Sequence, residues 1–202
     1  MTTFFLIRHA SMDTLGHRIV GREPAVHLNQ RGRGEAEKLA ARLAQLPVSA
    51  IYSSPMERAQ ETAKAIAGAL GREVLIDERL NEVDYGEWTG KTFDELHRMS
   101  EWRRYNRQRR TAEIPGGESM PQLAERAWQT MEQLRKSHDT GVVILVSHAD
   151  WIRAAAAHYA EASLDVLQRF DVDPASISIL RVDGQKGRVV RWNDTGPSLP
   201  VQ

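Results

Sequence analysis

The chain has 202 residues, with 27 Lys and Arg against 27 Asp and Glu, seven His and no Cys. This length suits one ordinary domain that buries its own core, and the neutral charge argues against a nucleic-acid partner, which a basic excess would favour. The lack of cysteine excludes disulfides, cysteine-ligated metal sites and a thiol nucleophile.

No apolar stretch approaches the roughly 18 residues of a membrane helix. The apolar run near the start breaks at Arg8 after four residues, and no basic segment precedes it, so it does not resemble a signal peptide. We therefore expect a soluble, cytoplasmic protein without a membrane partner, folded as a single domain over residues 1–202.

Short apolar runs alternate along the chain with stretches of helical periodicity. The runs predict buried strands, and apolar residues three and four positions apart predict a helix over 32–46. The predicted strands are 4–7, 50–52, 74–76 and 142–146, followed by a hairpin of 177–182 and 188–192 at a sheet edge. This order predicts an α/β fold, a three-layer αβα sandwich with a mainly parallel sheet and an antiparallel edge strand.

Three further helix starts are predicted from capping residues. Ser54 precedes Pro55 and Glu57, and Ser119 precedes a helix that runs to about Ser137. Asp150 is expected to cap another helix through the following alanines. The irregular, charged segment from about 85 to 117 is interpreted as a lid inserted over one face.

Polar residues of unusual types follow three of the predicted strands. Carboxyl ends of parallel strands lie on one sheet edge, where ligands bind in such folds. Arginine forks match tetrahedral oxyanions, and a neutral imidazole is a competent nucleophile near pH 7. The pattern indicates a phosphoryl site without metal, although each residue alone would more often be a capped turn or a solvated charge. The residues are Arg8-His9, Ser53-Ser54 with Arg58 one turn later, and Ser147-His148.

An ordered set of motifs spans about residues 4–155. In chain order they are Leu6-Ile7-Arg8-His9-Ala10, the run 28–36, the run 53–63, the run 80–90, Pro115-Gly116-Gly117-Glu118-Ser119 and Val146-Ser147-His148-Ala149. Together they resemble the signatures of the histidine phosphatase superfamily, which includes the cofactor-dependent phosphoglycerate mutases, with an Arg-His-Ala variant of the first signature. The resemblance implies a phosphoglycerate mutase-like fold.

The resemblance also implies a role for each matching residue. It makes His9 the nucleophile that becomes phosphorylated and Glu82 the proton donor to the leaving oxygen and then the base for water. The implied phosphoryl-oxygen ligands are Arg8, Arg58 and His148, with the backbone N–H of Ala149 as a helper. No metal and no cofactor is expected.

Some positions depart from the resembled pattern. Ala10 and Ala149 replace common glycines, and Ser11 stands where a glutamate is frequent. In place of a phosphate-contacting asparagine the chain offers only Asp13, Thr14, Leu15 or His17. None of these departures touches the implied catalytic roles.

A basic run with Trp102 and Tyr105 interleaved lies within the expected lid. It could be a solvated helix face, a single-stranded nucleic-acid platform, which the neutral net charge disfavours, or a lid that supplies an arginine to the substrate. Trp102-Arg103-Arg104 resembles a run in the mutases, so Arg103 and Arg104 are predicted substrate residues. The run comprises Arg98, Arg103, Arg104, Arg107, Arg109 and Arg110. His17, His27, His97, His138 and His158 have no metal-ligand spacing and are interpreted as structural or surface residues.

These features predict a metal-independent phosphatase that hydrolyses a small phosphorylated metabolite through phospho-His9. A phosphoglycerate mutase with the same core is the alternative, and an inactive binding module is disfavoured because no implied catalytic residue is missing. A dinucleotide-binding oxidoreductase would need Gly-x-Gly-x-x-Gly after the first strand, which the sequence lacks. The short lid favours the phosphatase, because water should reach phospho-His9 readily.

Overall fold

One six-stranded sheet forms the centre of the structure, a computed structural model that describes residues 1–184 and 186–196. The strand order is β3-β2-β4-β1-β5-β6, with β1 Thr2–Arg8, β2 Val48–Ser53, β3 Val74–Ile76, β4 Gly141–Ser147, β5 Ile177–Asp183 and β6 Lys186–Asp194. Strands β1 to β4 pair in parallel, whereas β5 pairs antiparallel with β1 and β6. The mainly parallel sheet is confirmed, and its antiparallel edge comprises the two strands of the expected hairpin. Gln185, which the sequence places between the two hairpin strands, and residues 197–202 lie outside the described part.

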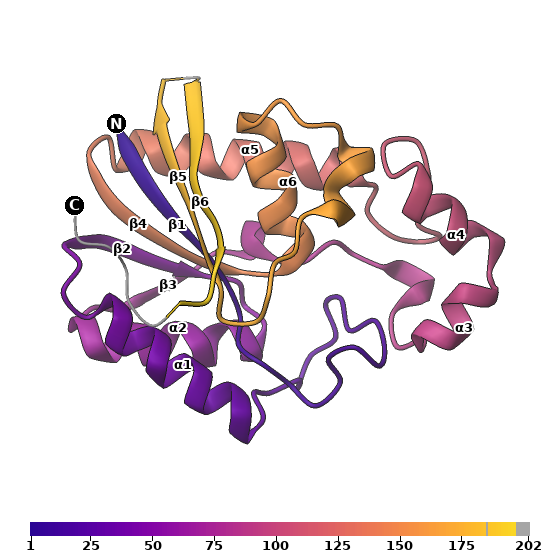
Figure 1. Ribbon diagram of the computed structural model, residues 1–202, viewed down its shortest axis with the longest axis horizontal. Helices are drawn as coiled ribbons and strands as arrows, with labels where there is room; N and C mark the ends of the chain where they lie inside the picture. Colours follow the sequence, from indigo (N-terminus) through magenta and orange to yellow (C-terminus); the bar gives the residue numbers. More distant parts are fainter. Residues whose placement is uncertain (185, 197–202) are drawn as a thin grey trace.

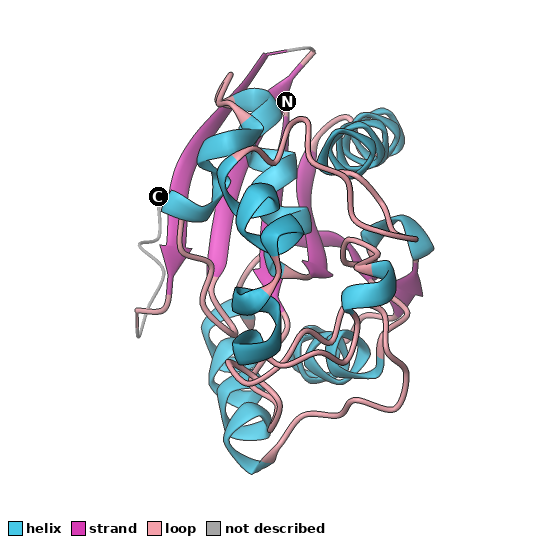
Figure 2. Ribbon diagram, turned by 90° about the vertical axis from the view of Figure 1, so that its right-hand side faces the viewer, coloured by secondary structure: helices cyan, strands magenta, loops and turns pink. Residues whose placement is uncertain are grey.

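Helices cover both faces of this sheet (Figures 1 and 2). On one face lie α1 (Gln30–Leu43) and α2 (Glu57–Leu70), and on the other lie α5 (Met120–Ser137) and α6 (Ala149–Tyr159). Successive side chains of a strand point to opposite faces. Accordingly, Phe4 and Leu6 join the core under α5 and α6, while Phe5 and Ile7 join the core under α1 and α2. The central strands are apolar throughout because both faces are covered.

The helix starts differ from the sequence prediction at two of three places. The predicted capping box at Ser119 is present. The prediction for Ser54 is wrong, because α2 has Met56 as its N-cap. The Ser54 hydroxyl accepts from the Met56 N–H at 3.3 Å and also bonds to side chains from other segments. The prediction for Asp150 is also wrong, because His148 is the N-cap of α6 and the Asp150 carboxylate lies in ion pairs. In both cases the side chain makes tertiary contacts and another residue is the N-cap.

The strand register brings three chain segments together at one sheet edge. Arg8 at the end of β1 pairs with Ser147 at the end of β4, and Ser53 at the end of β2 pairs with Val146. The residues that follow these three strands therefore lie side by side.

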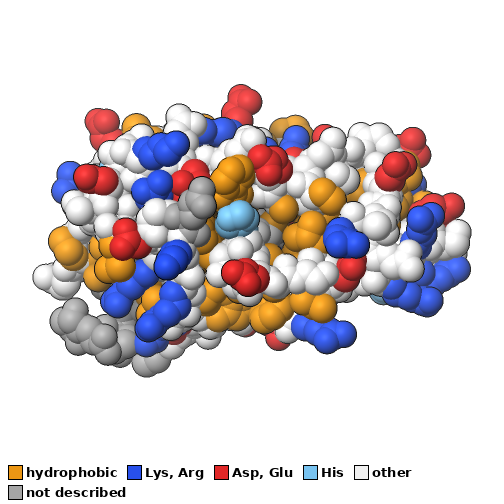
Figure 3. Space-filling model, turned by 90° about the horizontal axis from the view of Figure 1, so that it is seen from above, with side chains coloured by type: hydrophobic (Ala, Val, Ile, Leu, Met, Phe, Trp, Pro, Cys, Tyr) orange, Lys and Arg blue, Asp and Glu red, His pale blue; other side chains and the backbone are white. Residues whose placement is uncertain are grey.

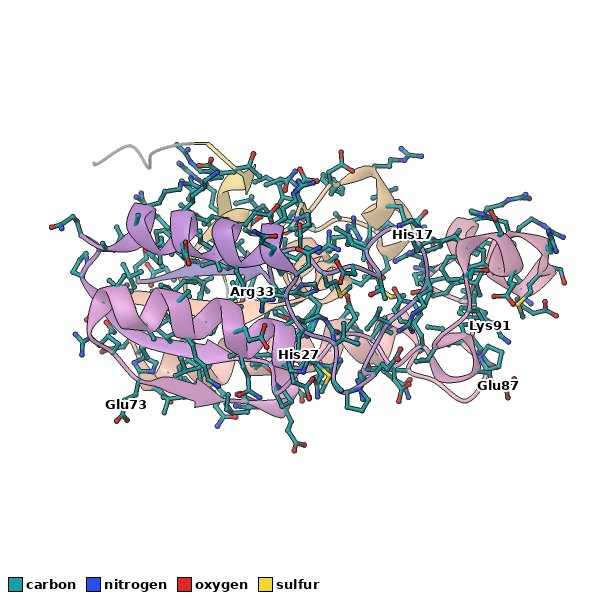
Figure 4. The ribbon with its side chains drawn as sticks, turned by 90° about the horizontal axis from the view of Figure 1, so that it is seen from below. His17, His27, Arg33, Glu73, Glu87 and Lys91 are labelled. Carbon is teal, nitrogen blue, oxygen red and sulfur yellow. The ribbon has the colours of Figure 1, made fainter. Side chains whose placement is uncertain are left out.

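Two long segments surround this edge. One is the loop of residues 9–29, and the other runs from 77 to 119 and contains η1 (Glu78–Leu80), η2 (Gly86–Trp88), α3 (Phe93–Arg98) and α4 (Ser100–Arg107). They join through Ile19, whose N–H donates to the Lys91 carbonyl at 2.9 Å and whose carbonyl accepts from Gly90 at 2.8 Å. His17 and Lys91 mark the two segments in Figure 4. In the last part of the chain, η3 (Leu164–Arg169) follows α6.

The described residues contain neither a membrane-spanning helix nor a cluster of metal ligands. None of their helices has both the length and the apolar content needed to cross a membrane. Nor do any three His, Asp or Glu side chains among them gather as metal ligands would.

The contact between α1 and the loop after His9 gives a stability prediction. A Cβ on Gly32 would lie 2.0 Å from the Ser11 carbonyl oxygen, whereas a Cβ on Gly34 would meet nothing within 4 Å. We expect Gly32→Ala to lower the free energy of unfolding by about 1–3 kcal/mol through overpacking. The control Gly34→Ala should raise it by roughly 0.5–1 kcal/mol through helix propensity. Denaturant unfolding measures both changes, and equal effects would contradict the proposed contact.

Candidate active site

A cavity of about 260 Å³ lies at the sheet edge where the three strands end. Every residue for which the sequence predicted a catalytic or phosphate-binding role lines it, namely Arg8, His9, Arg58, Glu82, His148 and Ala149. They come from β1, α2, the segment after η1, and the start of α6. The fold therefore assembles in one place residues that are 140 positions apart in the chain.

His9 presents a free ring nitrogen to this cavity. Its Nδ1 lies 2.9 Å from the Ala10 carbonyl oxygen, which can only accept, so Nδ1 carries the proton and Nε2 keeps its lone pair. Burial lowers the pKa of the imidazole well below its usual value, and the charges of Arg58 and Arg8 lower it further. His9 is therefore neutral near pH 7 and is a competent nucleophile.

A hydrogen-bonded chain orients the second histidine. The Ser54 hydroxyl donates to Asn81 Oδ1 at 2.9 Å, so it accepts from His148 Nε2 at 2.8 Å. The remaining nitrogen of His148, Nδ1, accepts from Arg58 Nη2 at 3.3 Å. Burial and then the Arg58 charge lower the pKa of His148 well below its usual value. Ser54, predicted as a helix cap, thus belongs to the site; its position directly after a strand end was the signal for this role.

Two arginines supply positive charge beside the histidines. Arg58 is 1% exposed and donates through Nη2 to the Gly21 carbonyl at 2.6 Å, and Arg8 donates through Nη1 to the Val172 carbonyl at 2.6 Å. Burial lowers the pKa of Arg58 to about 10, so it stays charged near neutrality. Within the described residues, Nε and Nη1 of Arg58 and Nε of Arg8 are buried without a hydrogen-bond partner. Unpaired buried donors are costly, and an oxyanion is the ligand that satisfies a guanidinium fork.

Glu82 forms another wall of the cavity. Its carboxylate accepts from the backbone N–H of Trp151 at 3.2 Å and of Asp150 at 3.4 Å, at the start of α6. Its main-chain carbonyl accepts from Arg22 at 2.9 Å and Arg126 at 3.3 Å. Burial raises the pKa of the Glu82 carboxyl and the negative charge of Asp150 raises it further, against the effect of the N–H donors. A raised pKa lets the carboxyl keep its proton to higher pH, as a general acid requires.

The outer walls of the cavity come from the 9–29 loop, the expected lid, α6 and η3. These walls carry both apolar and polar side chains, so a ligand larger than phosphate would contact both kinds of surface. The apolar side chains are Met12, Leu15, Ile19, Val20, Phe93 and Trp102, and the polar ones are Arg18, Tyr85, Arg109, Asp150, Arg153 and Gln168.

The basic run in the lid has one inward-facing member, Arg109, which is 3% exposed. Arg103 is exposed, donates to the His97 carbonyl at 2.7 Å and lines an adjoining cavity, and Arg104 is exposed and lines neither cavity. Lys and Arg side chains project from this end of the molecule in Figure 3. The predicted substrate roles of Arg103 and Arg104 stay predictions. Trp102 and Tyr105, three residues apart, mark the buried face of α4, whereas Arg109 lies in the turn after this helix, so helical spacing does not identify it.

The other histidines lie away from the cavity. His17, His27, His97, His138 and His158 are absent from its walls. His27 pairs with Glu61 on α2 (Figure 4), and His138 bonds to Tyr52 at 3.0 Å.

The unpartnered donors of Arg58 give a binding prediction. Replacing Arg58 by Met should weaken binding of inorganic phosphate by roughly 10- to 100-fold, since a hydrogen bond to a charged group contributes about 1.5–3 kcal/mol. Isothermal titration of the folded variant measures this loss. Lys64→Met, an exposed change on the same helix, is the control and should leave the affinity unchanged. Equal affinities of the two variants would refute the anion site.

Known proteins with the same architecture share this arrangement of segments. The chain matches the family profile "Histidine phosphatase superfamily (branch 1)" over residues 4–195. It is 30% identical over 200 residues to Phosphoserine phosphatase 1 of Hydrogenobacter thermophilus, covering 96% of this chain and 93% of that one. The structure of Bacillus stearothermophilus YhfR superposes with a TM-score of 0.91 at 28% identity, covering 98% of this chain and 99% of that one.

A phosphoserine phosphatase from Entamoeba histolytica, solved with phosphoserine, superposes with a TM-score of 0.88 at 26% identity and covers 98% of this chain and all of that one. Family profile, relative and solved structures agree over nearly the whole length. The chain therefore belongs to the histidine phosphatase superfamily.

Proposed function

We propose that the protein is a phosphomonoesterase that hydrolyses small phosphomonoesters through a phosphohistidine on His9. The observation that carries this proposal is a neutral His9 beside the buried guanidinium of Arg58 and the half-buried one of Arg8, both of which hold buried donors with no partner among the described residues. Relatives and solved structures named as phosphoserine phosphatases and as glucosyl-3-phosphoglycerate phosphatase support it.

In the first step, His9 Nε2 forms a bond to phosphorus as the ester P–O bond breaks. Arg8, Arg58 and the backbone N–H of Ala149 hold the phosphoryl oxygens, whose charge the site stabilises during in-line transfer. His148, whose one N–H donates to Ser54, orients Arg58, and its direct contact with phosphate stays a prediction. The Glu82 carboxyl gives its proton to the leaving oxygen, so an alcohol departs. The products are the alcohol, phospho-His9 and an ionised Glu82.

The second step reverses the proton transfer. The Glu82 carboxylate takes a proton from water as the water oxygen bonds to phosphorus and the N–P bond breaks. The electron pair of that bond returns to His9 Nε2, phosphate leaves, and Glu82 is protonated again. Two easier displacements replace one difficult hydrolysis.

The alcohol part of the substrate would lie against the mixed walls between the loop of residues 9–29 and the lid. A small phosphorylated metabolite fits a cavity of about 260 Å³. Phosphoserine and 3-phosphoglyceric acid are bound in solved structures of the Entamoeba enzyme, and both classes of compound are candidates here. A cytoplasmic location and a single domain with a lid over about 85–117 stay predictions.

A mutase function is less supported. One relative, the probable phosphoglycerate mutase GpmB of Escherichia coli O1:K1, is 31% identical over 150 residues and covers 73% of this chain and 70% of that one. A mutase must retain its intermediate and exclude water under a closing lid. Here the lid contributes Phe93, Trp102 and Arg109 to the cavity wall, but Arg103 lines an adjoining cavity and Arg104 lines neither. The two arginines that a mutase would use to hold its intermediate therefore lie outside the cavity wall.

The covalent step gives a first test of this function. The wild-type protein should yield an acid-labile phosphoenzyme after brief exposure to labelled phenyl phosphate, and His9→Ala should abolish both labelling and turnover. His27→Ala, at an exposed histidine, should retain both. Normal labelling of the His9→Ala protein would exclude His9 as the nucleophile. Transfer of the label to a second alcohol faster than phosphate release would favour the mutase.

The proton donor gives a second test. Glu82→Gln should slow hydrolysis of an alkyl phosphate about 10²–10⁴-fold, the usual contribution of general acid catalysis, and should slow an activated aryl phosphate far less. The wild-type kcat/KM for the alkyl ester should peak in acid solution. The lowered pKa of His9 keeps its lone pair available below pH 6.5, and the raised pKa of Glu82 keeps its proton above pH 4.5. An equal loss on both esters would assign Glu82 to binding instead.

A further inference from the structure

Asp150 is a buried carboxylate next to the reacting groups that the steps above do not use. It is 3% exposed and accepts from the Tyr85 hydroxyl at 2.7 Å, from Arg109 Nη1 at 3.1 Å and from Arg153 Nη1 at 2.9 Å. These donors come from the segment after Glu82, from the end of the lid and from the next turn of α6. One carboxylate thus ties together three segments that line the cavity.

The same turn of α6 holds Glu82 directly. The backbone N–H of Asp150 and that of Trp151 donate to the two oxygens of the Glu82 carboxylate, and Tyr85 follows Glu82 by only three residues. Asp150 therefore connects two segments on either side of Glu82. It belongs to the helix turn whose N–H groups contact the Glu82 carboxylate, and its side chain binds Tyr85 in the segment that carries Glu82.

The contacts also decide which of the two carboxyls holds a proton. Burial opposes ionisation of Asp150, but Arg109, Arg153 and the Tyr85 hydroxyl hold its pKa below the usual range. Glu82 has no arginine bonded to its carboxylate among the described residues. The two largest effects on its pKa, burial and the Asp150 charge, raise it, against the smaller lowering effects of the backbone N–H donors and the Arg8 charge. A like charge in a site of low dielectric constant disfavours the second ionisation. Asp150 itself has no proton to give, so it is not a second acid.

We propose that Asp150 is a positioning residue, whose buried negative charge keeps the proton on Glu82 and whose three hydrogen bonds hold the Glu82 segment against α6. This inference rests on the proposed function, because it assigns Glu82 the acid role. The titratable and charged groups that line the cavity with Glu82 are Arg8 from β1, Arg18 from the 9–29 loop, Arg58 and the two histidines, Asp150 and Arg153 from α6, Tyr85 from its own segment, and Arg109 from the lid. Arg22 and Arg126 reach only its main-chain carbonyl.

The decisive variant is Asp150→Asn, which removes the charge and keeps the shape. Without the negative charge, Glu82 loses its proton at lower pH, so the alkaline limb of kcat/KM for an alkyl phosphate should move to lower pH. Hydrolysis at about pH 8 should fall roughly tenfold more than at about pH 5, since one pH unit of displacement is a factor of ten. Hydrolysis of an activated aryl phosphate, which needs no acid, should be largely retained and reports that the site is folded.

Two matched variants separate charge from structure. Asp84→Asn removes a carboxylate two residues from Glu82 whose side chain is 44% exposed, where solvent screens its charge, and it should leave the limb in place. Arg109→Met removes one cation that balances Asp150 and should move the limb in the opposite direction, to higher pH. Equal losses on alkyl and aryl esters with an unmoved limb in Asp150→Asn would overturn the proposal, as would a limb that moves equally in Asp84→Asn.

A measurement without turnover keeps this inference distinct from the proposed function. The ¹³C signal of the Glu82 carboxyl, identified by its loss in Glu82→Gln, should titrate at lower pH in Asp150→Asn than in the wild type. If that shift occurs while Glu82→Gln leaves alkyl ester hydrolysis intact, the charge coupling stands and the acid role of Glu82 fails. An unshifted carboxyl signal refutes the role of Asp150, whatever the protein hydrolyses.

Discussion

The burial of the Arg58 charge is the constraint on which the site depends. A guanidinium 1% exposed keeps its charge only where acceptors face it, and here the acceptors are a main-chain carbonyl and the nitrogen of a histidine. Burial lowers the pKa of both histidines, and the positive charge of Arg58 lowers it further. One buried cation therefore contributes to the anion affinity of the cavity, to the neutral state of the nucleophile and to the orientation of His148.

The sequence predicts the sheet and the convergence of the site well, because both depend on patterns that tertiary contacts do not alter. A continuous apolar run such as 142–146 has to be a strand covered on both faces, and the polar residues after it have to lie at the sheet edge. The family resemblance then assigns catalytic or phosphate-binding roles to six residues, and all six line one cavity. They are Arg8, His9, Arg58, Glu82, His148 and Ala149.

The errors have a common physical cause. Ser54 and Asp150 have the residue types of helix caps, and propensity treats a cap as a local choice. In the folded protein distant groups compete for the same oxygen atoms: His148 and Asn81 for Ser54, and Tyr85 with two arginines for Asp150. Arg109 was missed for a related reason, since only the packing of Trp102 and Tyr105 tells which arginine of the run faces inward.

Both phosphate-directed arginines are anchored on main-chain oxygens, Arg58 on Gly21 and Arg8 on Val172. A carbonyl is present whatever side chain its residue carries. Substitutions in the loop before position 21, which lines the cavity through Leu15, Arg18 and Ile19, can therefore reshape the leaving-group walls while the arginines still bind the phosphoryl group, provided the backbone path is kept. This separation lets one phosphoryl-transfer core diverge toward many esters by changing loop side chains alone.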